Sequence, residues 1–189
     1  MKNNWTTTKL VAVGSLAVLD IIVGLAASVI TATTGITMAS GVITSITEPL
    51  ILMVCLLVVE KRGSALLFMT IVGVLALPIN YAGPPGFFAK LPILIALGFC
   101  CDVIHSGLKR INLWLDGIII GAFLCIWYTF AVALVGKWLQ IPGIDNFLYV
   151  MPIIYLVASV SLLGAIGGAL GVVVYKRIQY TTVVSRIRT

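Results

Sequence analysis

Four carboxylates fall inside long apolar runs of this sequence: Asp20, Glu48, Asp102 and Asp116. An ionisable group in hydrocarbon is costly, so it must pair, bind a proton or face a wet cavity, and it marks a functional site by default. Glu48 lies in the middle of its run and precedes Pro49, which lacks an N–H and so frees a backbone carbonyl. We expect Glu48 either to line a ligand cavity or to hydrogen-bond to a neighbouring helix, and the same two roles apply to Asp20.

The other two carboxylates, Asp102 and Asp116, and the single histidine, His105, also allow structural interpretations. Asp102 and His105 lie three residues apart, and therefore on one helix face, where they form a local pair, a partner contact or a proton relay. Asp116 follows Lys109 and Arg110 closely, so we expect it to hold its helix end near water and near those two cations.

Aromatic side chains, amides and a lysine cluster around the loops at the other ends of these runs. Aromatic walls with a few placed polar groups suit a flat, small heterocycle. We therefore predict a small-molecule pocket with Glu48 at its floor. Its residues are Glu48, Asn80, Tyr81, Lys90, Tyr128, Trp138, Asn146 and Tyr149. The alternatives are that the aromatic residues are interfacial belt residues and that Lys90 lies at lipid headgroups.

The elements that must position these groups are six apolar segments. A helix needs about 20 mostly apolar residues to cross roughly 30 Å of hydrocarbon, where its backbone must satisfy its own hydrogen bonds. The first run is too long for the apolar region of a signal peptide, so we expect it to be a retained helix. The sequence predicts an all-α integral membrane protein, with residues 1–189 forming one bundle of six transmembrane helices. The spans are about 9–32, 37–59, 64–82, 88–107, 113–136 and 148–175.

The composition supports this fold class. Hydrophobic residues make up 61% of the 189 residues, against 12 Lys and Arg and 6 Asp and Glu. This excludes a disordered chain, a secreted disulfide scaffold and an ordinary cytosolic enzyme. Despite the net charge of +6, it also excludes nucleic-acid binding, because the basic residues form short flanks around apolar runs. Ten of the 12 basic residues would share one side with both termini, which predicts that this side is cytoplasmic.

Small residues recur every three or four positions along the first and last segments, where they let helix backbones approach closely in lipid. They serve either packing within the bundle or docking of another membrane subunit. The candidate docking residues are Gly24, Ser28, Ala32, Gly164, Gly168 and Gly171.

The sequence lacks the motifs that are typical of several kinds of nucleotide binding and catalysis. It has no P-loop, no H-E-x-x-H and no G-x-S-x-G, and its four cysteines all fall within apolar runs without metal-ligand spacing. We therefore expect no catalytic residues, no metal and no cofactor, and a protein that is not an enzyme. The missing P-loop favours a subunit that obtains its energy from partners.

At this point the chain resembles the substrate-binding S components of energy-coupling factor (ECF) vitamin transporters. The stretch from Glu48-Pro49-Leu50 to Glu60-Lys61-Arg62-Gly63 is similar to the second helix and following turn of the S components for thiamine precursors. The ending Gly164-Ala165-Ile166-Gly167-Gly168, followed by Tyr175-Lys176-Arg177, is similar to their last helix.

The resemblance implies a multi-pass protein of a prokaryotic plasma membrane that binds a vitamin or its precursor in an outward-facing pocket. It implies partners as well: the lipid bilayer, and a membrane T component that rests on two ATPase subunits. The metal-binding N-terminal histidine of the cobalt and nickel members is absent, which disfavours a metal ion as substrate.

Three other interpretations stay open. The chain can be a stand-alone proton- or ion-coupled carrier or channel, with Asp20, Glu48 and Asp102 as its relay. It can be a membrane enzyme that uses Asp102, His105 and Asp116, although these are few convergent groups for such chemistry. It can also be an assembly or sensory subunit that transports nothing.

Overall fold

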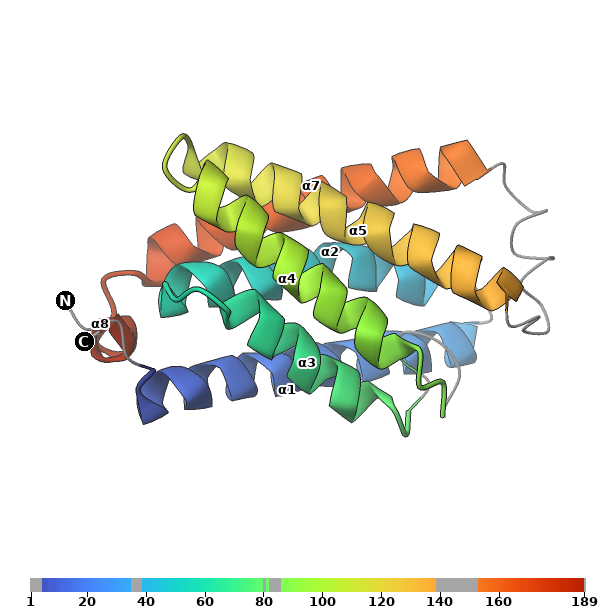
Figure 1. Cartoon of the computed structure of the whole chain (residues 1–189), viewed down its shortest axis with the longest axis horizontal. Coiled ribbons are helices and arrows are strands. Elements are labelled where there is room, and N and C mark those ends of the chain that lie inside the picture. Colours follow the sequence, from blue (N-terminus) through green and yellow to red (C-terminus); the bar gives the residue numbers. More distant parts are fainter. Residues whose placement is uncertain (1–4, 35–38, 80, 82–85, 139–152, 189) are drawn as a thin grey trace.

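The computed structural model describes residues 5–34, 39–79, 81, 86–138 and 153–188. Every regular element in this part of the chain is a helix, as the apolar runs predict (Figure 1). The helices are α1 (Thr7–Thr34), α2 (Ala39–Val59), α3 (Ser64–Ala76), α4 (Lys90–Leu108), α5 (Leu113–Trp138), α7 (Ile153–Ile178) and the short α8 (Thr182–Arg188).

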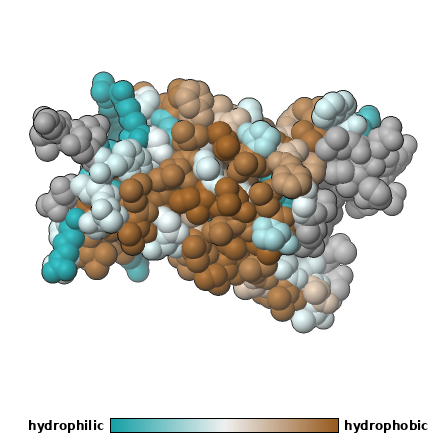
Figure 2. All heavy atoms as spheres, turned by 60° about the horizontal axis from the view of Figure 1, so that its bottom comes forward, coloured by the Kyte–Doolittle hydropathy of each residue, from teal (hydrophilic) through white to brown (hydrophobic). Residues whose placement is uncertain are grey.

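Five of these helices, α1, α2, α4, α5 and α7, are long and apolar enough to cross a membrane. Figure 2 shows apolar residues covering the middle of the visible face, with most of the strongly hydrophilic residues gathered at one end. Large apolar side chains on α1, such as Val11, Ile22 and Val29, are more than half exposed. An outer surface of this kind is what a multi-pass bundle presents to lipid.

The third predicted span, 64–82, is longer than the helix that forms. α3 has 13 residues and ends at Ala76, so it rises about 20 Å rather than the ~30 Å of a full crossing. Pro78 explains the ending, because proline has no N–H to donate and disfavours helical backbone at the residue before it. The Leu77 N–H turns back to the Val74 carbonyl in a tighter, three-residue turn.

The helices run roughly along one long axis, with both termini at the same end (Figure 1). The α2–α3 and α4–α5 turns lie at that end too, and they bring Lys61, Arg62, Lys109 and Arg110 there. We call this end the basic end. The shared end of the two termini agrees with the arrangement that the sequence predicts, whereas only five helices have the length of a full crossing.

α2 is the central helix, and its residues from Ile51 to Val59 are all buried. It packs against α1, α3, α5 and α7, while α7 also packs along α5 and α3 pairs with α4. Glycines permit the closest approaches, since a Cβ at Gly121 would strike the Gly164 carbonyl and a Cβ at Gly167 would strike that of Ile46. The small-residue pattern of the last segment therefore serves packing inside the bundle.

Candidate ligand-binding cavity

A polar cavity of about 130 Å³ lies in the half of the bundle away from the basic end, between α1, α2, α5 and the segment that follows α3. Its described lining consists of Ser28, Ser40, Gly41, Thr44, Glu48, Tyr81 and Tyr128. Ligand pockets usually measure about 300–1,000 Å³, whereas a cavity of about 150 Å³ holds one benzene ring. The described walls thus enclose room for a single aromatic ring or its equivalent.

Glu48 is the charged group of this cavity. The residue is 9% exposed, and none of the hydrogen bonds between described residues reaches its carboxylate. Ser40, Gly41 and Thr44 precede it at spacings of eight, seven and four residues, which places all four on one face of α2. The Thr44 hydroxyl bonds back to the Ser40 carbonyl, so the α2 wall is polar but largely satisfied within itself. An acceptor without a donor is the feature that points to a ligand.

Tyr81 joins the cavity to a second buried carboxylate. Its hydroxyl donates a hydrogen bond of 3.0 Å to Oδ2 of Asp20, which is 1% exposed. Its ring lies against Gly24, one turn further along α1, where any Cβ would overlap the ring. Asp20 and Glu48 also lie close enough to interact electrostatically. Because Tyr81 satisfies Asp20, Glu48 is the carboxylate left for a ligand.

The backbone carbonyl that Pro49 frees has a partner on another helix. Proline at position 49 cannot donate to the carbonyl of Ser45, four residues earlier. The Cys125 thiol of α5 donates to that carbonyl instead, at 3.5 Å. The α2 helix thus continues through Pro49 next to the cavity, with α5 supplying the missing donor.

The structure places other predicted pocket residues elsewhere. The Lys90 ammonium is buried and donates to the carbonyls of Ala76 (3.0 Å) and Ile79 (3.1 Å). These carbonyls belong to the last turn of α3 and its continuation, so the charge compensates a helix end. Trp138 is 82% exposed at the end of α5 and does not line the cavity. Three further predictions, Asn80, Asn146 and Tyr149, lie outside the described residues.

The candidate docking residues are divided between the cavity, the surface and the core. On α1, Gly24 supports Tyr81, Ser28 lines the cavity and Ala32 is exposed. On α7 the three glycines are buried against neighbouring helices of the same chain. Gly164 and Gly168 contact α5, and Gly171 contacts α2. Docking through these residues stays a prediction, and for the three on α7 it competes with contacts that the bundle itself makes.

The polar residues of α4 and α5 have partners that the sequence did not indicate. Asp102 accepts hydrogen bonds from the backbone N–H groups of Ala65 (3.2 Å) and Leu66 (2.9 Å), so it caps the start of α3. Asp116 is fully buried and lies 2.6 Å from Nδ1 of His105. Our expectation that Asp116 stays near water is therefore corrected: a buried carboxylate needs a close partner, and the imidazole supplies it.

The sequence prediction missed the small polar residues of the cavity wall. Ser40 and Thr44 precede Glu48 at helical spacing, and that spacing is the signal that would have found them. Ser28 had been considered only as a docking residue. Among the described residues, no three His, Cys, Asp or Glu side chains are grouped closely enough to hold a metal ion. The cavity offers a ligand one carboxylate, several hydroxyls and two aromatic rings.

Comparison with models of protein families, with curated protein sequences and with solved structures finds no match to this chain.

Proposed function

We propose that the protein is the substrate-binding membrane subunit of an ATP-driven uptake transporter of the ECF type. The observation that carries this proposal is the Glu48 carboxylate, which is 9% exposed, lines a polar cavity and receives no hydrogen bond from another described residue. A buried carboxylate in that state costs several kcal/mol unless it takes a proton or a ligand. A bound ligand with a donor group removes that cost.

The cavity defines the class of ligand. An amino group or protonated ring nitrogen would meet Glu48 in a charge-assisted hydrogen bond. Tyr81 and Tyr128 offer aromatic surface to a flat ring, and Ser28 and Thr44 offer hydroxyls to its polar edge. The enclosed volume of about 130 Å³ suits one heterocycle of the kind found in vitamins and their precursors. We therefore expect a small heterocycle that carries a donor nitrogen.

The charge distribution supports an orientation in the membrane, and the missing P-loop supports a need for partners. We propose that the basic end is cytoplasmic, that the cavity opens outward and that α3 with its continuation completes a sixth crossing. Because the sequence has no P-loop, transport needs partners with ATPase activity, and we propose a membrane T component with two ATPase subunits. External labelling of a cysteine introduced at position 2, in intact cells, would contradict this orientation.

The experiment that tests the function has two parts. Mass spectrometry of protein purified in mild detergent should find a bound small heterocycle. Uptake of that compound is then measured in liposomes that contain the chain alone, or the chain with an ECF module and internal ATP. We expect uptake only in the second preparation. Uptake by the chain alone would contradict the proposal.

An ion-coupled carrier is the second candidate, and the contact between Asp20 and Tyr81 next to Glu48 favours it. The expected relay also included Asp102, which lies on α4 with both carboxylate oxygens bonded to the start of α3. A relay of these three groups would therefore have to break the cap of α3. Uptake by the chain alone that follows an imposed pH gradient would establish this second candidate.

A further inference from the structure

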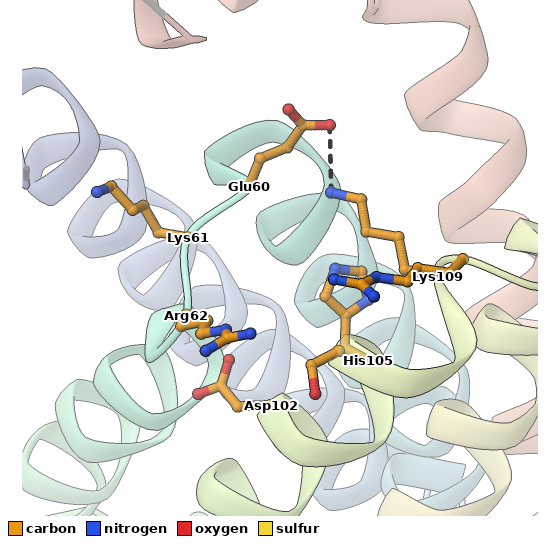
Figure 3. Close-up of a pocket in the computed structure, with 8 residues that line it drawn as sticks. Glu60, Lys61, Arg62, Asp102, His105 and Lys109 are labelled. Carbon is orange, nitrogen blue, oxygen red and sulfur yellow. Dashed lines mark hydrogen bonds and ion pairs between the residues drawn. The ribbon is translucent and has the colours of Figure 1, made fainter. Parts of the chain in front are cut away.

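A second pocket, of about 380 Å³, lies at the basic end between the α2–α3 turn and the end of α4. It is distinct from the cavity at Glu48. Figure 3 shows Glu60, Arg62, Asp102, His105 and Lys109 arranged around it, and Arg110 also lines it. The function proposed above makes no use of this pocket.

A buried ring nitrogen of this pocket lacks a partner among the described residues. His105 is 8% exposed, and its Nδ1 lies 2.6 Å from the Asp116 carboxylate, which is acceptor-only when ionised. Nδ1 therefore carries the proton and donates it. Nε2, the other ring nitrogen, is buried and has no hydrogen-bond partner among the described residues. With Nδ1 engaged by Asp116, Nε2 is the ring nitrogen that is open to a hydrogen bond with a ligand.

The acidic groups of the pocket are already engaged. The oxygens of Asp102 accept from the start of α3, and Glu60 pairs with Lys109 at 3.4 Å. Arg62 and Arg110 have no ion pair within the described part of the chain. Lys61, from the same turn as Arg62, has a buried amino group without a described partner, and burial lowers its pKa. The pocket thus presents an excess of donors and positive charge.

We propose that this pocket binds a phosphate group through a hydrogen bond between a phosphate oxygen and Nε2 of His105, together with the guanidinium groups of Arg62 and Arg110. Guanidinium groups offer forked pairs of N–H donors that match phosphate oxygens, and the buried Nε2 adds a contact at a fixed position. Asp116 acts as the positioning residue, because its contact with Nδ1 holds the ring. The phosphate comes either from a soluble compound or from the headgroup of an anionic phospholipid, and the experiment separates these two sources.

The test uses the fact that the chain has one histidine, so ¹⁵N-histidine labelling gives one pair of ring signals. The full-length protein is placed in phosphatidylcholine nanodiscs and titrated with inorganic phosphate. A second sample contains phosphatidylglycerol and no free phosphate. We expect a saturable shift of the Nε2 signal in at least one sample. A shift with free phosphate identifies a soluble ligand, and a shift only with phosphatidylglycerol identifies a lipid.

Matched variants control for general charge effects. Arg62→Gln should weaken the response about tenfold or more, because it removes a charged donor. Arg177→Gln removes an exposed basic residue of α7 that does not line the pocket, and it should leave the response unchanged. An unchanged Nδ1 signal in each variant shows that the contact with Asp116 persists. The absence of a saturable shift in both samples would overturn the proposal. An equal shift with chloride at the same ionic strength would also overturn it.

Discussion

The Tyr81 hydroxyl lies 3.0 Å from Oδ2 of Asp20, its partner from 61 residues earlier in the chain. The bond ties the segment that follows α3 to the middle of α1. It also explains how a carboxylate can lie at 1% exposure inside an apolar helix. Since Tyr81 lines the cavity as well, the same residue forms part of the cavity wall and ties two segments of the bundle together.

Replacing Tyr81 with phenylalanine should destabilise the protein. The change keeps the ring against Gly24 but leaves the Asp20 carboxylate without its donor, which costs about 1–3 kcal/mol. The free energy of unfolding in detergent, measured by titration with denaturant, checks this. In an Asp20→Leu background, the same replacement should cost much less. An equal cost in both backgrounds would show that the hydrogen bond is not what stabilises this contact.

Gly24 should tolerate no side chain at all. A Cβ there would overlap the Tyr81 ring, so Gly24→Ala should displace Tyr81 from the cavity and weaken ligand binding. Gly14→Ala is the matched control on the same helix, because nothing lies within 4 Å of the added Cβ. The control should raise stability slightly, by up to about 1 kcal/mol, since alanine favours helix. Equal effects of both changes on binding would contradict the contact.

The partner of the Ser45 carbonyl can be tested with a double-mutant cycle. Pro49→Ala restores the backbone N–H that can bond to that carbonyl, which makes the Cys125 thiol redundant. Cys125→Ala should therefore cost about 0.5–1.5 kcal/mol more in the natural chain than in the Pro49→Ala chain. The packing lost with the sulfur atom is common to both and cancels. Additive costs in the unfolding free energy would exclude the thiol as the replacement donor.

The contact between α5 and α7 should be intolerant of even one methyl group. Gly121→Ala would push a Cβ into the Gly164 backbone, and overpacking of this kind costs about 1–3 kcal/mol. Gly107→Ala in α4 meets nothing within 4 Å and serves as the control. Thermal unfolding of the two variants in the same detergent should separate them, with a lower midpoint for Gly121→Ala only. Matching midpoints would indicate that the two helices are not in close contact.

The outline of the fold follows from hydrophobicity alone, because runs of about 20 apolar residues have few alternatives to membrane helices. The residue at which α3 ends could not be predicted from hydrophobicity, although Pro78 is visible in the sequence. Its neighbours are as apolar as any span, and only the backbone geometry shows that the helix stops at Ala76. The contacts of Lys90 depend on that ending, because the Ala76 and Ile79 carbonyls lie where the regular hydrogen bonds of α3 stop.

The sequence predicted the main polar and aromatic residues of the cavity, but it did not predict which small residues complete the cavity wall. Glu48, Tyr81 and Tyr128 were expected together from their types and depths, and they line one cavity. Ser28 could not be assigned to it, since the rotation of α1 against α2 decides which face of α1 is turned inward. The pairing of His105 with Asp116 depends likewise on how α4 packs against α5.

The central claim is that the Glu48 carboxylate holds the ligand. Calorimetric titration of the ligand identified by mass spectrometry should give a dissociation constant about ten- to hundredfold higher for Glu48→Gln than for the natural protein, because a charge-assisted hydrogen bond is lost. The chain's other glutamate, Glu60, is exposed in the turn after α2, so Glu60→Gln applies the same chemical change far from the cavity and should leave the constant unaltered. A dissociation constant for Glu48→Gln equal to that of Glu60→Gln would contradict the account.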